Sequence, residues 1–159
     1  MNSRESIFLH CPELDRSSYP PECPFNSHRA GMTRSTLVSL GLLGVTNRTE
    51  MAPVRAGIAD LEEFHSPPYL AALRRAETGH LDPEGLAMGL GTSDCPVFKG
   101  MYTYATLASG ASITGARLIL GGKAQIAFNP SGGYHHAAPD HAAGFCYIND
   151  IVLAALALL

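Results

Sequence analysis

Short apolar runs and longer helical patterns alternate along this chain. Residues 6–10 and 124–128 are apolar runs of strand length, which is typical of buried strands. Between them, apolar or small residues recur at helical spacing. Because successive parallel strands are joined by helical crossovers, this alternation predicts an α/β fold with a mainly parallel sheet. In such a fold, the loops that follow the carboxyl ends of the strands build the functional site.

Two helices are indicated by apolar spacing together with end signals. In residues 28–43, three leucines recur at helical spacing, and Gly44 follows as the residue expected to end the helix. Residues 67–78 begin with a proline directly after Ser66. A capping serine followed by proline is typical of a helix start. Residues 60–63 have the form of a capping box and predict one further helix start.

The second half of the chain predicts two more helices and a long loop between them. Residues 100–120 carry small residues that form a close-packing face, and Gly121 ends the segment. A last helix starts at a cap on Asn149 or Asp150 and continues through the apolar residues 151–159. Segments rich in glycine, proline and polar residues are predicted to be loops, at 11–24, 80–99 and 129–147.

Composition and charge exclude several classes of function. Eleven basic against fourteen acidic residues give a net charge of −3, so the chain lacks the basic excess that direct nucleic-acid binding requires. The longest apolar run, residues 151–159, is well short of the roughly 18 residues that span a bilayer, and the N-terminal segment lacks the apolar core of a signal peptide. We therefore expect a cytoplasmic protein with no nucleic-acid or membrane partner.

The hydrophobic fraction of 46% against 16% charged residues fits one globular domain with its own core.

Cysteine spacing argues against a zinc ribbon and against a disulfide framework. The four cysteines are scattered and form no Cys-x-x-Cys pair. We expect them to be reduced thiols, at Cys11, Cys23, Cys95 and Cys146.

The strongest candidate for chemistry follows the second strand. There, residues 129–131 lead into Gly132 and Gly133, and two adjacent histidines, His135 and His136, follow after Tyr134. Glycines let the backbone turn or approach a ligand. Histidine titrates near neutral pH, so a pair at the mouth of a sheet suits general base and general acid work. Without further context, such a pair is more often a hydrogen-bonded feature of a surface loop.

The sequence around this pair resembles a known family block. Residues 132–150, Gly-Gly-Tyr-His-His-Ala followed by Gly-Phe-Cys-Tyr-Ile-Asn-Asp, closely resemble the histidine block of the histone deacetylase superfamily. Residues 24–29, 64–70 and 89–96 resemble further segments of that family in the same order. The resemblance implies that residues 1–159 are the N-terminal part of a single deacetylase domain, an incomplete arginase/deacetylase-like three-layer α/β/α domain.

The form of one block indicates which branch of the superfamily the chain resembles. Residues 91–94, Gly-Thr-Ser-Asp, are more similar to the bacterial acetoin-utilization-type branch than to the animal nuclear enzymes. This segment is one residue longer than the Gly-Tyr-Asp form of some members, and Asp94 is its matching carboxylate. In the family, the matching carboxylate accepts hydrogen bonds from the substrate backbone at the rim of the tunnel.

The resemblance also implies an activity and roles for individual residues. The activity is zinc-dependent hydrolysis of an N-acetyl amide, typically on lysine, in which zinc polarises the carbonyl group and activates a water. His135 and His136 would flank the water and the leaving amine, one as general base and the other as acid or electrostatic partner. Gly144 and Phe145 match residues that line the acyl-lysine tunnel. Arg29 matches a position near the channel for departing acetate, although a surface arginine is nearly as well supported.

Two further clusters near the pair are interpreted as structural. Asp140 and His141 could suggest a metal site, but the family motif leaves this stretch outside the ligand set. Cys95 and Cys146 lie on segments that the family places near the pocket, and two unconnected buried thiols fit them better than a redox pair.

The zinc ligands that the family uses do not match any segment of these residues. They are an Asp-x-His segment and a later aspartate, so the resemblance places zinc ligands beyond residue 159 and none within this chain. The chain alone is therefore expected to be inactive, and the apolar residues 151–159 are expected to need neighbours that it does not supply.

Two other functions remain open at this stage. Within the superfamily, the substrate could be an acetylpolyamine or another small acetylated amine instead of acetyl-lysine on a protein. Alternatively, the chain could be a non-catalytic, truncated binding module. The intact histidine pair at His135 and His136 argues against decay of the site.

Overall fold

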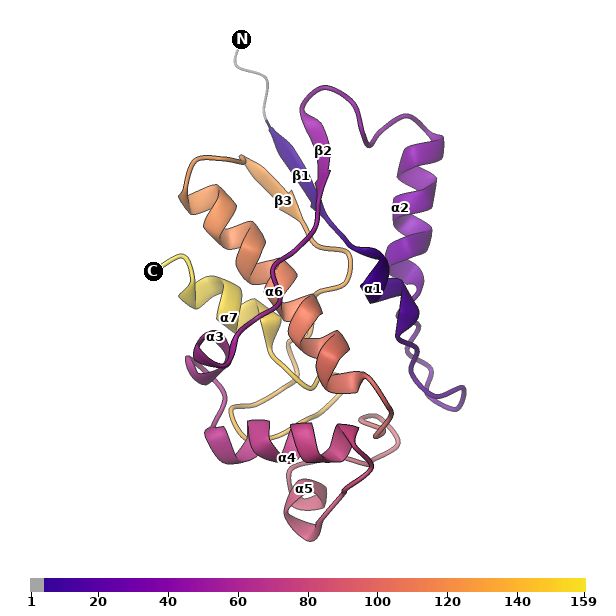
Figure 1. Ribbon diagram of the computed structural model, residues 1–159, viewed down its shortest axis with the longest axis vertical. Coiled ribbons are helices and arrows are strands. Elements are labelled where there is room, and N and C mark those ends of the chain that lie inside the picture. Colours follow the sequence, from indigo (N-terminus) through magenta and orange to yellow (C-terminus); the bar gives the residue numbers. More distant parts are fainter. Residues whose placement is uncertain (1–4) are drawn as a thin grey trace.

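A three-stranded parallel sheet is the framework of the fold. The computed structural model describes residues 5–159, and residues 1–4, which begin the N-terminal segment considered above, lie outside the described residues. The central strand β1 (Ser6–Leu9) pairs in parallel with β2 (Arg48–Met51) on one side and with β3 (Ile126–Phe128) on the other. The parallel sheet and both predicted strands are confirmed, each slightly shorter than expected (Figure 1).

The sequence does not predict β2, for a physical reason. All four of its residues are exposed, and only Met51 is apolar, so the hydrophobic pattern that marks a strand is missing. The strand forms through backbone pairing, in register from Ser6 opposite Arg48 to Leu9 opposite Met51.

One face of the sheet is covered by two helices. The side chains of Ile7 and Leu9 point to this face and form one apolar cluster with Ala111 of α6 (Met101–Leu120). The second helix, α7 (Asp150–Leu156), packs along α6, and both lie on the same side of the strands (Figure 1). Helix α6 confirms the predicted helix over residues 100–120.

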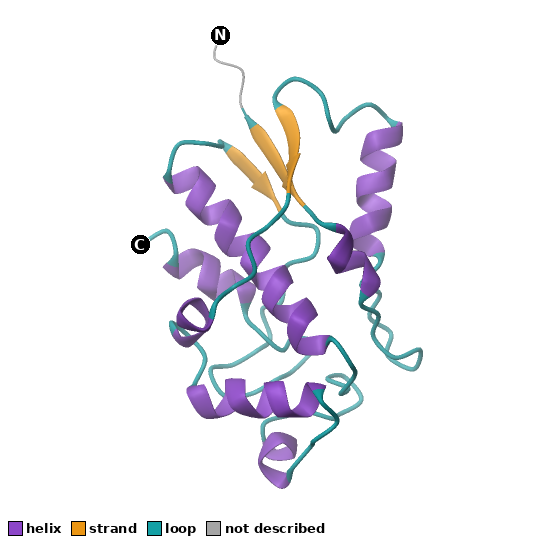
Figure 2. Cartoon of the chain, viewed as in Figure 1, coloured by secondary structure: helices purple, strands orange, loops and turns teal. Residues whose placement is uncertain are grey.

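A second helical layer lies against part of the opposite face. Strand side chains alternate between faces, so Phe8 points away from α6, as does Glu50, its partner in the register with β2. There, Arg34 of α2 (Arg29–Ser39) donates to the Glu50 carboxylate over 2.6 Å. The short α1 (Pro12–Arg16) packs against α2. The result is the predicted three-layer α/β/α arrangement (Figure 2).

Helix α6 is also crossed by an extended segment at very close range. The backbone nitrogen of Ala56 donates to the Thr106 carbonyl oxygen (3.1 Å), and that of Val54 donates to the Thr114 hydroxyl (3.1 Å). Gly110 lies beneath this crossing, where a Cβ atom would overlap the Val54 carbonyl oxygen and lie 2.5 Å from the Ala56 nitrogen. A glycine is required here because the backbones touch.

Two helix starts confirm the predicted caps. At α4 (Pro67–Glu77), the Ser66 hydroxyl accepts from the Tyr69 nitrogen over 3.4 Å. At α7, the Asn149 side chain accepts from the Val152 nitrogen over 3.1 Å. These bonds satisfy backbone N–H groups that have no partner within the first turn of a helix.

The predicted end of the helix over residues 28–43 is wrong by several residues. Helix α2 ends at Ser39, because Gly41, with φ +66°, adopts the left-handed conformation. The Leu42 nitrogen then donates back to the Leu37 carbonyl oxygen (2.9 Å), which is the hydrogen bond of a Schellman motif. Gly41 and Gly44 could each terminate the helix, and the earlier one, Gly41, does so.

Two short helices lie where the sequence predicts other features. Helix α3 (Ile58–Glu62) starts earlier than the predicted capping box, so Asp60 is its third residue and accepts from the Gly57 nitrogen over 2.8 Å. Helix α5 (Pro83–Ala87) lies inside the predicted loop over residues 80–99 and is capped by Asp82. Its Asp-Pro start is a signal that the interpretation as a loop overlooked.

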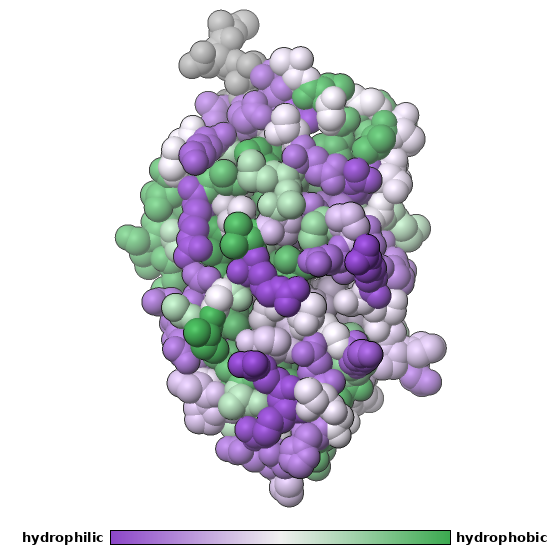
Figure 3. Space-filling model, viewed as in Figure 1, coloured by the Kyte–Doolittle hydropathy of each residue, from purple (hydrophilic) through white to green (hydrophobic). Residues whose placement is uncertain are grey.

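Apolar side chains are exposed on the side of the molecule formed by β3, α7 and the end of α6. Within the described residues, β3 has a strand partner on one side only. Figure 3 shows hydrophobic surface at this margin, near the chain end. None of the described helices has the length and apolar character to cross a membrane. The exposed apolar residues here are Ile119, Leu120, Ile126, Phe128, Ile151, Leu158 and Leu159.

The crossing over α6 makes a prediction about Gly110. Gly110→Ala should lower the free energy of unfolding by about 1–3 kcal/mol through overpacking, despite alanine's higher helix propensity. The matched change Gly115→Ala lies in the same helix and meets only side-chain atoms, Ala127 Cβ and Leu9 Cδ1, at 3.0 Å. It should therefore cost less. Urea unfolding midpoints measure both, and a Gly110→Ala protein as stable as Gly115→Ala would contradict the packing described here.

Candidate active site

The histidine pair lies in the loop that joins β3 to α7. The ring centroids of His135 and His136 are 4.2 Å apart, and both side chains are exposed. His135 Nδ1 lies 3.0 Å from the Gly133 carbonyl oxygen. Since a carbonyl oxygen only accepts, Nδ1 carries the proton. In the neutral imidazole with this tautomer, the Nε2 atom of His135 is the acceptor.

A buried carboxylate fixes the backbone just before the pair. Asp150 is fully buried and accepts hydrogen bonds from the Gly133 nitrogen (3.1 Å), the Tyr134 nitrogen (2.6 Å) and the Ser112 hydroxyl. At Gly132, a Cβ atom would lie 2.5 Å from Asp150 Oδ2. The first glycine of the motif is therefore needed for close approach to this carboxylate.

A second set of hydrogen bonds holds the backbone on the other side of the pair. The Asn149 side-chain amide donates to the carbonyl oxygens of Ala137 (2.9 Å) and His135 (3.3 Å). The Asn149 backbone nitrogen donates to His65 Nε2 (3.0 Å), and His65 Nδ1 donates to the Pro139 carbonyl oxygen (3.3 Å). Burial lowers the pKa of His65, so its imidazole stays neutral and can both accept and donate.

The role of His65 is not predicted from the sequence. Residues 64–70 resemble a family segment, but that resemblance predicts no function for this histidine. The available signal was a histidine directly before the capping Ser66, and its partner Asn149 lies 84 positions away.

Gly144 lies directly against His136, and Phe145 is the next residue along the chain. A Cβ atom on Gly144 would be 2.7 Å from His136 Cδ2, so the absence of a side chain lets the imidazole pack on the backbone. Both residues have positive φ, +53° for Gly144 and +67° for Phe145. Asp94 supports this strained segment, because its Oδ2 accepts from the Gly144 nitrogen (2.8 Å) and its carbonyl oxygen accepts from the Phe145 nitrogen (3.0 Å).

Arg29 joins the same region from α2. Its Nη2 donates to the Gly132 carbonyl oxygen over 3.3 Å, and its guanidinium carbon lies 5.0 Å from the centroid of the Phe25 ring. The Phe25 ring stacks in turn against Phe145, with centroids 5.9 Å apart. The side chain of Arg29 is exposed yet bonded to the glycine turn before the histidines. The structure thus gathers Arg29, Asp94, His135, His136, Gly144 and Phe145 in one region.

Two pairs near the histidines are interpreted as structural from the sequence: Asp140 with His141, and Cys95 with Cys146. Asp140 and His141 are both exposed. Across residues 5–159, no group of three or more His, Cys, Asp or Glu side chains is arranged to hold a metal ion. Cys95 and Cys146 are buried, free thiols. Burial raises the pKa of Cys95 to about 12 and also raises that of Cys146, so both remain protonated.

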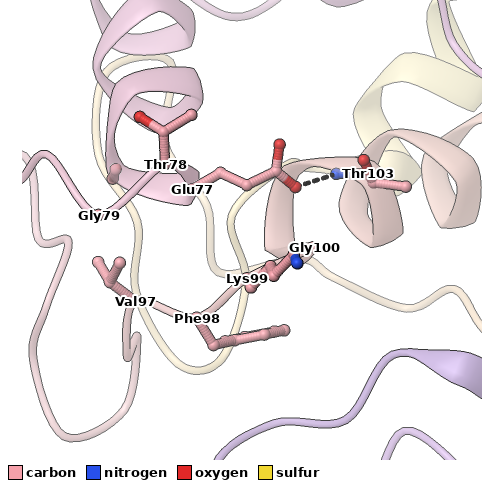
Figure 4. Close-up of a pocket in the computed structure, with 9 residues that line it drawn as sticks. Glu77, Thr78, Gly79, Val97, Phe98, Lys99, Gly100 and Thr103 are labelled. Carbon is pink, nitrogen blue, oxygen red and sulfur yellow. Dashed lines mark hydrogen bonds between the residues drawn. The ribbon is translucent and has the colours of Figure 1, made fainter.

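A cavity of about 660 Å³ lies apart from the histidines, between the end of α4 and the start of α6. In Figure 4, Glu77 reaches across it and accepts a hydrogen bond from the Thr103 nitrogen (3.1 Å). Phe98 forms part of its wall and contacts Tyr19, with ring centroids 4.8 Å apart. The predicted site residues do not line this cavity.

Comparison with known proteins supports the resemblance found in the sequence. Residues 23–159 match the model of the histone deacetylase domain. The chain is 40% identical over 158 residues to histone deacetylase 2 of Oryza sativa subsp. japonica, covering 98% of the chain and 31% of that protein. It is 44% identical over 135 residues to histone deacetylase 8 of Xenopus tropicalis, covering 82% of the chain and 35% of that protein.

A solved structure shares the fold. The crystal structure of a histone deacetylase homologue from Aquifex aeolicus superposes with a TM-score of 0.84 at 26% identity, covering 96% of this chain and 40% of that one. The chain thus spans about a third of the length of the curated relatives cited above. The assignment to the acetoin-utilization-type branch stays a prediction. The domain match, the relatives and the shared fold together show that the chain belongs to the histone deacetylase family.

Proposed function

We propose that the protein containing this chain is a zinc-dependent deacetylase that hydrolyses the N-acetyl amide of acetyl-lysine. The single observation that carries the proposal is the exposed pair His135 and His136, with ring centroids 4.2 Å apart and with His136 against Gly144. Membership of the histone deacetylase family supports the reaction class.

The described residues do not form a zinc site by themselves. Between residues 5 and 159, no cluster of three potential ligand side chains is present. We propose that the ligands come from sequence beyond residue 159, since this chain spans only about a third of the length of its relatives. The chain alone would then be inactive. In the complete protein, zinc would supply Lewis-acid activation of the acetyl carbonyl group and of a water.

The histidines handle protons in this proposal. Because His135 Nδ1 donates to Gly133, its Nε2 is free to accept a proton from the attacking water. A protonated imidazole of the pair can then donate to the leaving amine nitrogen. His136 lies against Gly144 and is exposed, as His135 is. Either ring can therefore serve as the base.

The neighbouring residues would hold the substrate. The Phe145 ring offers an apolar face to the aliphatic stem of acetyl-lysine. The Asp94 carboxylate accepts from Gly144 and from the Thr92 hydroxyl, and its remaining lone pairs could accept from the substrate backbone. Arg29 supplies a positive charge behind the glycine turn that would attract departing acetate.

Variants of the complete protein test the roles of the histidines. His135→Ala and His136→Ala should each lower kcat by about 10²–10⁴-fold, the range for lost acid or base catalysis, and should leave the zinc content nearly unchanged. His141→Ala, an exposed neighbour outside the pair, should keep most of the activity. Steady-state kinetics and elemental analysis measure both quantities. Loss of zinc in proportion to activity would show that the pair contains a metal ligand instead.

The substrate class is tested with two substrates. We expect a higher kcat/KM on an acetyl-lysine peptide than on an acetylated polyamine, because only the peptide supplies backbone N–H groups from which the Asp94 carboxylate could accept hydrogen bonds at the proposed rim. A strong preference for the polyamine would favour the small-molecule alternative. A complete protein that binds zinc but hydrolyses neither substrate would favour a non-catalytic binding module.

The Asp94 contacts predict a pH dependence in the chain itself. Hydrogen bonds from Gly144 and Thr92 hold the pKa of Asp94 below its usual value, which is about 3.9 in unfolded chains. The stabilisation of the Gly144 backbone is therefore fully present above about pH 4 and is lost as the pH falls through the lower, folded pKa. The Gly144 amide shift should titrate in this acid range and lose the transition in Asp94→Asn. A midpoint at or above the ordinary aspartate pKa would contradict the lowered pKa of Asp94.

A further inference from the structure

A hydroxyl group far away in sequence holds the carbonyl group of Phe145. Tyr19, in the segment between α1 and α2, donates from its hydroxyl to the Phe145 carbonyl oxygen over 2.8 Å, across 126 positions. We infer that Tyr19 is a positioning residue that sets the wall formed by Phe145 in the substrate tunnel. This inference rests on the proposed function only in assigning Phe145 to that tunnel.

The backbone of Phe145 needs such support. Its φ of +67° lies in the left-handed region, which a non-glycine residue with a bulky side chain rarely adopts. A strained conformation persists only where its surroundings hold it. Here the nitrogen is held by the Asp94 carbonyl oxygen, the carbonyl oxygen by Tyr19, and the ring by stacking on Phe25.

Tyr19 is itself held rigidly. It is 7% exposed, and its ring centroid lies 4.7 Å from that of Phe25, 4.8 Å from Phe98 and 6.0 Å from Tyr147. Burial raises the pKa of Tyr19 far above its ordinary value. The hydroxyl therefore stays protonated and remains a donor throughout the pH range in which the fold exists.

The hydroxyl and the ring of Tyr19 have separable roles. The ring packs against Phe25 and Phe98 and contributes to the core, whereas the hydroxyl makes the bond to Phe145. Phe145 follows Gly144, on which the His136 imidazole packs. Release of the Phe145 carbonyl should therefore loosen the tunnel wall beside the pair without removing core packing.

Tyr19→Phe removes only the hydroxyl, and Tyr104→Phe is the matched control. The Tyr104 hydroxyl is also buried and bonded, to the Tyr134 hydroxyl at 2.8 Å, and its ring centroid lies 6.2 Å from that of Tyr19. In the chain carrying Tyr19→Phe, the Phe145 amide should exchange with deuterium about tenfold faster, the effect of one lost hydrogen bond. Tyr104→Phe should leave that rate unchanged.

The exchange result decides the inference even without an activity assay. Unchanged Phe145 exchange in Tyr19→Phe, or an equal acceleration in both variants, would overturn it. An acceleration in Tyr19→Phe that also appears at the Leu73 amide, in the middle of α4, would mean general loosening of the core and would overturn it as well.

Kinetics of the complete protein give the second readout. Tyr19→Phe should raise KM for an acetyl-lysine peptide about fivefold, with kcat within about twofold, because a displaced wall weakens contact with the stem while the reacting groups stay in place. A fall in kcat with unchanged KM would contradict this role. A wild-type protein without deacetylase activity would instead refute the proposed function, and the exchange measurement would still decide whether Tyr19 positions Phe145.

Discussion

The buried carboxylate of Asp150 is the constraint on which the rest of the site depends. It is fully buried and accepts hydrogen bonds from the Gly133 and Tyr134 nitrogens and from the Ser112 hydroxyl. Burial of a carboxylate is costly unless hydrogen bonds replace its water. The loop must therefore turn tightly around Asp150, which requires glycine at position 132 and directs the next residues, the histidines, to the surface.

Fold and site share the same residues at this point. Asp150 is the first residue of α7, and Asn149 caps that helix while holding the far side of the histidine loop. A carboxylate in the first turn is also favoured by the helix dipole. Helix α7 packs along α6, which covers the sheet. Movement of either helix would therefore shift the loop that carries His135 and His136.

The sequence predicts those parts of the fold whose signals are local. The starts at Ser66 and Asn149 are confirmed because a capping side chain bonds within its own first turn. Strand β2 is not predicted because its pairing with β1 uses the backbone and leaves its side chains exposed. The end of α2 is placed too late because Gly41 and Gly44 both have positive φ, and local sequence does not rank them.

In the candidate site, too, the sequence predicts only part of the arrangement. The most direct test of how the site is shaped is Asp150→Asn. The motif residues were found through their resemblance to a family, and their catalytic roles stay predictions, whereas Tyr19 and His65 act through partners 126 and 84 positions away. In Asp150→Asn, the Gly133 and Tyr134 amides should exchange at least about tenfold faster, while the Leu73 amide keeps its protection. Unchanged exchange at Gly133 and Tyr134 would contradict the claim that this carboxylate shapes the histidine loop.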